Sequence, residues 1–458
     1  MNIWSILLSL LIFSLLIFIH ELGHFIVARL CGVKVLEFAI GMGPRLLSWK
    51  SKKSGTVYAV RAFPIGGFVN MLGENGMEAV QGDNGTNDKE LPSLVNETDD
   101  LEKTADTEPQ PIDPTLAKQA YCNQNVWKRL LISVAGPFMN IALGFILMLS
   151  VVLMQGHDYM GTTEVARFVV QYQGESIENG LQTGDQIEWV NGSRLDSKAQ
   201  LTELIMTDED GILDLDVLRY DAERRVVKVA LKDVSLTEES LADFAGSKSE
   251  ETGLRLGDKI LKINSAHTHI MHDVSYEIMM KGNRPMTITV LRDGEKVKLE
   301  NVSVPTQTEA GSTVGLMDFQ VRQEKNYNPF TILKHSWFRS ITNVKMVYDS
   351  LIGLFTGRFG IESVSGPIGL TTAVGDVAKA GFTSVLNLVV IISVNLGVMN
   401  LLPIPALDGG HIFIYLIEVI RRKPMKKEVE GIINFVGLIL ILGLAVIIAI
   451  KDIITIIL

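Results

Sequence analysis

Four long apolar runs dominate the hydrophobic pattern of this chain. A run of about 20 apolar residues is enough for a helix to cross the hydrocarbon core of a bilayer. The runs lie at about 3–28, 130–154, 382–402 and 432–450. No Lys or Arg precedes the first run, which favours a retained span over a cleaved signal peptide. The pattern therefore predicts a polytopic α-helical membrane protein with four spans, within the regions 1–30, 128–155, 382–411 and 430–451.

The stretch 31–72 has a strand-like pattern instead. Strand-like runs at 35–40 and 56–60 are separated by glycines and other turn residues. A further break at 64–67, Pro-Ile-Gly-Gly, leads into Phe-Val-Asn-Met at 68–71. We expect a β element that dips into the membrane from the cytoplasmic side. An ordinary hairpin on the cytoplasmic surface is the alternative.

A sequence pattern occurs twice between the second and third runs. Residues 180–191, GLQTGDQIEWVN, recur at 253–264 as GLRLGDKILKIN, with an offset of 73 residues. The pattern indicates a turn, a tight Gly-Asp corner and a strand. It resembles the corresponding stretch of bacterial PDZ domains, so we expect two α+β PDZ domains at 160–232 and 233–307. Such domains bind peptides by strand addition, but two rigid spacers with empty grooves are the alternative.

Apolar residues then recur at helical spacing over 328–356. Charged residues, among them Lys334, Arg339, Lys345 and Asp349, lie between these apolar positions. The pattern predicts an amphipathic helix, either lying on the outer leaflet or packed against the PDZ pair. The apolar positions are Phe330, Leu333, Trp337, Ile341, Val344, Leu351 and Phe355.

Composition supports a membrane protein that carries a soluble portion. The chain has 458 residues, of which 47% are hydrophobic. Much of the formal net charge of −10 comes from residues 73–118, where 12 Asp and Glu stand against three Lys. This stretch predicts a disordered acidic insert. The two cysteines, Cys31 and Cys122, both lie before the second run, so the segment 156–381 has to fold without a disulfide.

Basic residues predict the orientation in the membrane. Short cytoplasmic loops are enriched in Lys and Arg. The connection between the third and fourth runs is densely cationic, so we expect it on the cytoplasmic side, with both termini and 156–381 outside. The basic residues of this connection are Arg421, Arg422, Lys423, Lys426 and Lys427.

The first run ends in the motif His20-Glu21-Leu22-Gly23-His24. On a helix, positions i and i+4 share a face, so both imidazoles can point at one zinc ion. Glu21 lies about 100° further round, where a general base is needed beside the attacking water. Soluble helices also contain this short motif by chance. Within an apolar run, however, these polar side chains are costly, which favours a metal site.

A third zinc ligand is available in the third run. It continues into Leu401-Leu402-Pro403-Ile404-Pro405-Ala406-Leu407-Asp408-Gly409-Gly410-His411, whose prolines and glycines predict a broken helix. Asp408 can complete a site with one open position; a simple helix N-cap is the alternative. His411 is a competing candidate for the third ligand. Because it lies one turn after Asp408, a role in supporting the ligands from behind is favoured. Polar or irregular positions that could hold a substrate carbonyl or an oxyanion are Asn395, Asn400, Pro403 and Pro405.

The combination of motifs resembles the site-2 protease family over nearly the whole chain. The motifs on which this resemblance rests are HELGH in the first span, GPFMN at 136–140 in the second, and NLLPIPALDGG at 400–410 in the third. This resemblance implies one Zn²⁺ held by His20, His24 and Asp408, with Glu21 as the catalytic base. It also implies cleavage of membrane proteins within the bilayer, with a membrane-dipping β element close by.

The resemblance also implies partners and location. Expected substrates are anti-sigma factor-like proteins and signal-peptide remnants in the bacterial inner membrane, with periplasmic PDZ domains acting as a size filter. No nucleic-acid partner is expected. A non-catalytic membrane scaffold or metal-handling protein with peptide-binding PDZ domains is the alternative. Glu21 favours the enzyme, because a metal carrier has no use for a base beside its ligands.

Overall fold

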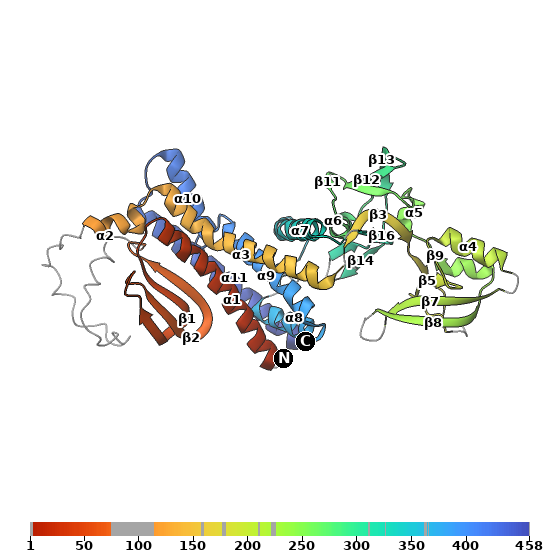
Figure 1. Cartoon of the computed structure of the whole chain (residues 1–458), viewed down its shortest axis with the longest axis horizontal. Coiled ribbons are helices and arrows are strands. Elements are labelled where there is room, and N and C mark those ends of the chain that lie inside the picture. The colour runs from red at the N-terminus through yellow and green to blue at the C-terminus, as the bar shows by residue number, and fades with distance from the viewer. Residues whose placement is uncertain are drawn as a thin grey trace. The chain divides into compact units, whose positions relative to one another are not determined.

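A computed structural model describes residues 3–74, 114–156, 160–175, 180–208, 211–220, 226–309, 312–325, 327–360, 364 and 366–457. The chain divides into two compact units, residues Met1–Leu147 with Val364–Leu458 and residues Met148–Ser363. Each unit is described by itself (Figure 1). Most of the predicted acidic insert 73–118 falls outside the described residues.

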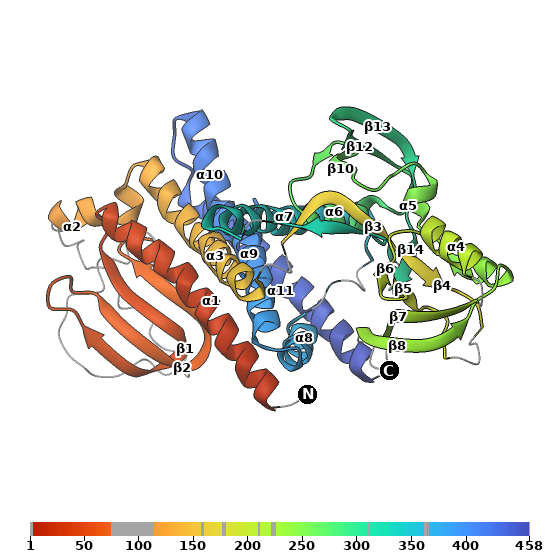
Figure 2. The same ribbon diagram turned by 45° about the vertical axis from the view of Figure 1, so that its right-hand side comes forward.

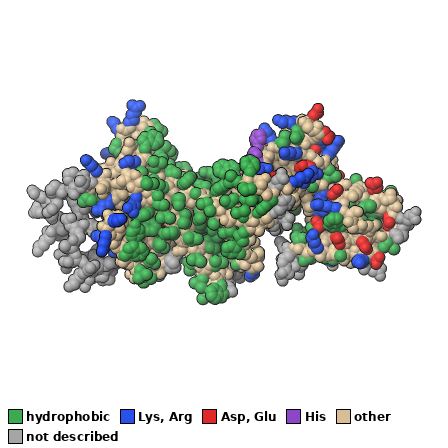
Figure 3. All heavy atoms as spheres, in the orientation of Figure 1, with side chains coloured by type: hydrophobic (Ala, Val, Ile, Leu, Met, Phe, Trp, Pro, Cys, Tyr) green, Lys and Arg blue, Asp and Glu red, His purple; other side chains and the backbone are tan. Residues whose placement is uncertain are grey.

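Long apolar helices form the first unit. Four helices in the described part of the chain are long and apolar enough to span a membrane, which confirms the expected number of spans. Figure 3 shows that hydrophobic side chains cover much of the central helices of this unit on the face turned to the viewer, as expected of a lipid-facing surface. The spanning helices are α1 (Ile3–Leu30), α3 (Val126–Gln155), α9 (Phe382–Leu401) and α11 (Lys427–Ile457). Shorter helices are α2 (Pro114–Gln119), η2 (Tyr121–Asn123), α8 (Pro367–Lys379) and α10 (Asp408–Arg421).

The predicted break of the third span is confirmed. The helix α9 ends at Leu401, and α10 begins at Asp408, so 382–411 is not one continuous helix. Glycine is required at the start of α10, because a Cβ on Gly409 would lie 2.0 Å from the Leu402 carbonyl oxygen. The break therefore folds the chain tightly back and places Asp408 in the first turn of a new helix.

A small sheet lies beside α1 in the same unit (Figures 1 and 2). Its strands, β1 (Val35–Lys50) and β2 (Val57–Met71), are longer than the sequence pattern predicts, and both bend. Residues 37–40 of β1 pair on one side with 67–70 of β2 and on the other with 57–60, while 47–50 also pair with 57–60. The segment 67–70 therefore forms one edge of the sheet among the described residues, and β2 packs against α1.

Two similar sheets form the second unit. Their strand orders are β8-β7-β5-β4-β9 and β13-β12-β10-β3-β16, with β6 paired to β5 and β11 to β10. The first contains β4 (Val170–Tyr172), β5 (Gln186–Val190), β6 (Ser193–Arg194), β7 (Ile212–Tyr220), β8 (Val226–Ser235) and β9 (Phe244–Ala245), with α4 (Lys198–Thr207) and η4 (Glu239–Asp243). The second contains β3 (Gly161–Phe168), β10 (Lys259–Ile263), β11 (Ala266–His267), β12 (Met286–Arg292), β13 (Glu295–Val302) and β16 (Phe319–Gln323), with α5 (Lys248–Glu251) and α6 (Met271–Lys281). A hairpin of β14 (Thr306–Glu309) and β15 (Ser312–Gly315) accompanies it.

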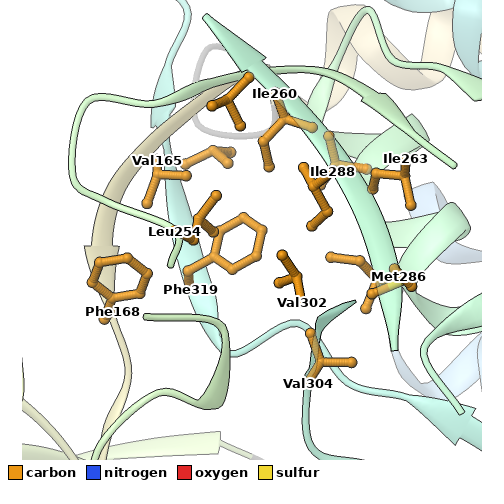
Figure 4. Packing of buried hydrophobic residues seen from close by; sticks show 14 residues of the cluster. Val165, Phe168, Leu254, Ile260, Ile263, Met286, Ile288, Val302, Val304 and Phe319 are labelled. Carbon is orange, nitrogen blue, oxygen red and sulfur yellow. The ribbon is translucent and has the colours of Figure 1, made fainter. Parts of the chain in front are cut away.

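The structure corrects the expected boundaries 160–232 and 233–307. Strand β3 pairs with β10 and β16 and therefore belongs to the second sheet, so the first domain is nested within the second. Val165 and Phe168 of β3 lie in the second core, beside Phe319 of β16 (Figure 4). The repeated sequence pattern does not contain β3 or β16. Only their pairing with strands distant in sequence shows that they belong to the second domain.

An ion pair repeats at the Gly-Asp corner of both domains. Arg219 binds Asp185 through two hydrogen bonds of 2.8 and 2.7 Å and also donates to the Gly180 carbonyl. Arg292 binds Asp258 in the same way, at 2.8 and 2.7 Å, and donates to Gly253. The two arginines share the sequence offset of 73 residues. The repeat therefore extends well beyond the pattern visible in the sequence.

The predicted amphipathic helix is present as α7 (Pro329–Phe355). Polar side chains attach it to α6, with Thr342 donating to Asp273 at 2.8 Å and Tyr276 donating to Asp349 at 2.7 Å. Phe330, Trp337 and Phe355 point away from the domain, and Phe355 is 87% exposed. The helix thus packs on the second domain with its polar face, and the exposed apolar face is typical of a helix on a membrane surface. Its location on the outer leaflet stays a prediction.

Candidate active site

Three potential metal ligands converge in the helical unit. Nε2 of His20 lies 2.9 Å from Oδ2 of Asp408, and Nε2 of His24 lies 3.4 Å from the same oxygen. The two Nε2 atoms are 3.2 Å apart. The described residues contain no other comparable group of three His, Cys, Asp or Glu. The break in the third span thus brings together residues nearly 400 positions apart in sequence.

This group fits zinc in both donor type and spacing. Two imidazole nitrogens and one carboxylate oxygen form the ligand set of many catalytic zinc sites, which keep a fourth position open. Tetrahedral ligands at ordinary zinc–ligand bond lengths lie about 3.3 Å from one another, close to the observed separations. Both histidines are buried, and Asp408 lies at a helix N-terminus, where the helix dipole favours a carboxylate.

Helix α3 approaches this group closely because it has a glycine at the contact. A Cβ on Gly136 would lie 2.3 Å from Nε2 of His24 and 2.8 Å from Nε2 of His20. On the opposite helix, a Cβ on Gly23 would lie 2.4 Å from the Ala135 carbonyl oxygen. Both glycines belong to motifs noted in the sequence, HELGH and GPFMN. Their role is therefore to let two helices meet at the candidate metal site.

A cavity of about 600 Å³ opens beside the three ligands. Glu21 lies in its wall, as the prediction of a nearby base requires. Other residues lining it include Phe68, Val69 and Met71 of β2, and Glu74, Arg129, His411, Glu418, Glu430 and Asn434. His411 does not belong to the three-ligand group; its Nδ1 lies 3.2 Å from Glu430.

The four predicted substrate or oxyanion residues lie elsewhere. Asn395, Asn400, Pro403 and Pro405 do not line the cavity. Asn395 is exposed, because it falls on the face of α9 that turns away from the bundle. Asn434 of α11 does line the cavity, and its side chain accepts a hydrogen bond from the Ala406 backbone at 3.3 Å. Asn434 could have been found from the sequence, because a polar residue within an apolar span indicates a functional position.

The sheet edge contributes backbone donors to the cavity. Glu74 accepts a hydrogen bond from the Met71 backbone N–H at 3.2 Å, and Val69, two residues earlier on the strand, lines the cavity together with Glu21. Alternate residues of a strand direct their backbone groups to the same side. The edge of β2 therefore faces the cavity, and a Cβ on Gly67 would lie 3.3 Å from Cγ of Glu21.

A polar network closes the other side of the cavity. Arg129 donates to Glu418 at 2.6 Å, and Glu418 also accepts from the Met425 backbone at 2.8 Å. The hydroxyls of Tyr121 and Tyr415 share a hydrogen bond of 2.9 Å. Burial raises the pKa of both tyrosines, so both stay protonated at neutral pH. This network joins α3 to α10 and fixes the helix that begins with Asp408.

Comparison with known proteins identifies the family. A model of peptidase family M50 matches residues 8–444. The chain belongs to peptidase family M50. A Clostridium acetobutylicum protein provisionally named as a zinc metalloprotease is 29% identical, over 99% of this chain and 98% of its own length. The Bacillus subtilis regulator of sigma-W protease RasP is 27% identical over 98% of both chains. The Bacillus licheniformis zinc metalloprotease RasP is also 27% identical over 98% of both chains.

Membership of this family confirms the expected resemblance to site-2 proteases. The protein is a multi-pass membrane metalloprotease of the site-2 type, and its cofactor is Zn²⁺. Its substrates are membrane proteins. The non-catalytic scaffold is thereby set aside in favour of the enzyme.

Replacing Gly136 with alanine tests the close helix contact. Gly136→Ala puts a methyl group into the space between the two imidazoles, so zinc affinity should fall by about tenfold or more. Gly443→Ala is the matched control, because this glycine also lies in a spanning helix but has open space around its Cα. Zinc affinity is measured by competition with a chromogenic chelator. Equal affinity for Gly136→Ala and Gly443→Ala would show that α3 does not constrain the site.

Proposed function

We propose that His20, His24 and Asp408 hold the zinc and that Glu21 is the general base for peptide hydrolysis. The observation that carries this proposal is the convergence of three zinc-type donor atoms within 4.8 Å of one another, beside a cavity that also contains Glu21. Zinc, when bound, supplies Lewis acidity and makes a water molecule a stronger nucleophile.

Glu21 then accepts the proton of the attacking water and passes it to the leaving amine. Its neighbours suit this role. Glu21 lies in the wall of the cavity, and the nearby Gly67 has no side chain to crowd its carboxylate. A base has to lie within hydrogen-bond reach of the proton that it takes, directly or through one water, and Glu21 lines the same cavity as all three ligands.

We further propose that the substrate pairs with the edge of β2 at 67–71. A peptide bond inside an intact helix is shielded by its own hydrogen bonds, so the substrate has to unwind before attack. Unwound backbone is tolerated in a membrane only where protein or water satisfies it. The edge of β2 offers the necessary donors and lies along the cavity, and strand addition would hold the peptide extended beside the metal.

A proline at position 69 tests strand addition. Proline has no backbone N–H, and edge strands accept it, so Val69→Pro should lower cleavage by about tenfold or more while zinc content stays at the wild-type level. Val69→Ala is the control, because it shortens the side chain and keeps the N–H. Cleavage of a purified transmembrane substrate in detergent gives the rate. Equal rates for the two variants would argue against pairing at this edge.

We propose transmembrane proteins such as anti-sigma factors and signal-peptide remnants as substrates. The family resemblance and the name of the Bacillus subtilis relative, a regulator of sigma-W protease, support the first class. We also propose a location in the bacterial cytoplasmic membrane, with the cationic connection 421–427 inside and residues 156–381 outside. The basic residues of that connection support this orientation.

The two nested domains are proposed to be PDZ domains that filter substrates by size. The resemblance of the repeated pattern supports the PDZ assignment, and the shared Arg–Asp corner supports a common fold for both copies. They are inserted in the sequence between the second and third spans, both of which contribute to the candidate site. Domains of roughly 75 residues have a radius of gyration of about 11 Å, large enough to obstruct a folded outer domain but not a short tail.

Deleting residues 160–323 tests the size filter. The deletion removes both domains, including β3 and β16, and should allow cleavage of a substrate whose folded outer domain is intact. Zinc content and the cleavage of a short-tailed substrate should remain. A deletion protein that still cuts only short-tailed substrates would contradict the filter and favour a peptide-binding role.

A labelling experiment on the full-length chain establishes the orientation on which the size filter depends. With both native cysteines replaced by serine, a membrane-impermeant thiol reagent added outside should label Ser265→Cys and not Pro424→Cys. Labelling of Pro424→Cys alone would invert the proposed orientation and remove the basis for an external filter.

A further inference from the structure

Helix α3 faces the second ring nitrogen of each candidate histidine ligand. Nδ1 of His24 lies 2.7 Å from the Ile132 carbonyl oxygen in a buried contact. A carbonyl oxygen only accepts hydrogen bonds, so Nδ1 of His24 carries the proton. Nε2 then keeps its lone pair and points it toward Asp408. A backbone atom therefore fixes this imidazole in the tautomer that a metal needs.

His20 has no such backbone acceptor and faces a side chain instead. Nδ2 of Asn140 is placed 3.2 Å from Nδ1 of His20. Asn140 is fully buried, and its other terminal atom, Oδ1, has no hydrogen-bond partner among the described residues. Nitrogen and oxygen of an amide differ only in the hydrogen bonds they make, so their positions follow from the network around them.

The two possible amide orientations have opposite consequences for the metal. With Nδ2 toward the ring, Asn140 donates to Nδ1, the proton of the neutral imidazole lies on Nε2, and His20 cannot bind a metal through that atom. With the amide turned over, Oδ1 lies at the same position and accepts a hydrogen bond from Nδ1–H. The second orientation leaves Nε2 free for a ligand bond, and the amide atom without a hydrogen-bond partner among the described residues is then Nδ2 instead of Oδ1.

We infer that Asn140 is a positioning residue whose side-chain carbonyl fixes the metal-binding tautomer of His20. This inference rests on the proposed role of His20 as a zinc ligand. Asn140 does for His20 what the Ile132 carbonyl does for His24, and both come from one face of α3, eight residues apart. The rings of both ligands would thus be oriented by the helix that Gly136 brings against them.

Packing holds Asn140 in place for this role. Ser393 of α9 donates to the Asn140 backbone carbonyl at 2.8 Å in a fully buried contact. A Cβ on Gly397 would lie 2.8 Å from the Pro137 carbonyl oxygen, and one on Gly144 would lie 2.6 Å from Val394. Helices α3 and α9 therefore meet closely on either side of Asn140, which limits movement of the amide.

Two substitutions of similar shape separate hydrogen bonding from packing. Asn140→Leu keeps most of the volume and removes the acceptor, whereas Asn140→Asp keeps an acceptor and removes the donor. Zinc affinity of the purified full-length chain is measured by chelator competition, and cobalt(II) absorption reports the ligand geometry. Asn140→Leu should weaken zinc binding by about 10- to 100-fold, while Asn140→Asp should bind within about threefold of wild type or more tightly.

Matched controls make each outcome decisive. Ser393→Ala removes a contact to the backbone of Asn140 but not to His20, so its zinc affinity should match wild type. Equal loss of zinc affinity in Asn140→Leu and Asn140→Asp would show a packing role and overturn the inference. Wild-type zinc affinity in Asn140→Leu would also overturn it. If Asn140→Leu does not fold, a tenfold loss of zinc affinity in folded Asn140→Asp overturns it.

A variant of His20 itself separates this inference from the proposed ligand set. His20→Ala should lower zinc affinity more than any Asn140 variant does. If His20→Ala binds zinc normally, the ligand assignment itself fails. If His20→Ala loses zinc and Asn140→Leu does not, only the role of Asn140 fails.

Discussion

The structure depends on one constraint, which is that two imidazoles and two carboxylates have to be held among helices built for a bilayer. Isolated in hydrocarbon, such groups are costly. Here they face one another, with Asp408 in contact with His20 and His24, and Glu21 in the wall of the same cavity. These groups thus have polar neighbours, and much of the surface of the surrounding helices is apolar.

The irregular features of the helical unit follow from that constraint. The broken third span presents Asp408 at a helix N-terminus instead of burying it along a continuous helix. The glycines of α1, α3 and α10 remove side chains where backbones have to approach. The edge of β2 brings backbone hydrogen-bonding groups to the same cavity, where a substrate could use them without exposing its own backbone to lipid. The site and the binding edge are thus parts of one arrangement.

The sequence predicts the parts of this arrangement that depend on local spacing. HELGH places two imidazoles on one helix face, and prolines and glycines break the third span. Features that depend on long-range contacts were not predictable. Asn395 and Asn400 lie in the expected helix but do not line the cavity, since the sequence does not show which side of α9 faces it. Strand β3 joins the second domain through pairing with β10 and β16, which the repeated pattern does not include.

The central claim is that Asp408 is a zinc ligand while Glu21 is a base, and metal content measured alongside proteolysis tests it most directly. Purified Asp408→Ala should lose most of its zinc and all cleavage, because two histidines alone bind zinc weakly. Glu21→Gln should keep about one zinc per chain and lose cleavage, because an amide cannot accept the proton. Full zinc occupancy in Asp408→Ala, or loss of zinc in Glu21→Gln, would contradict this account.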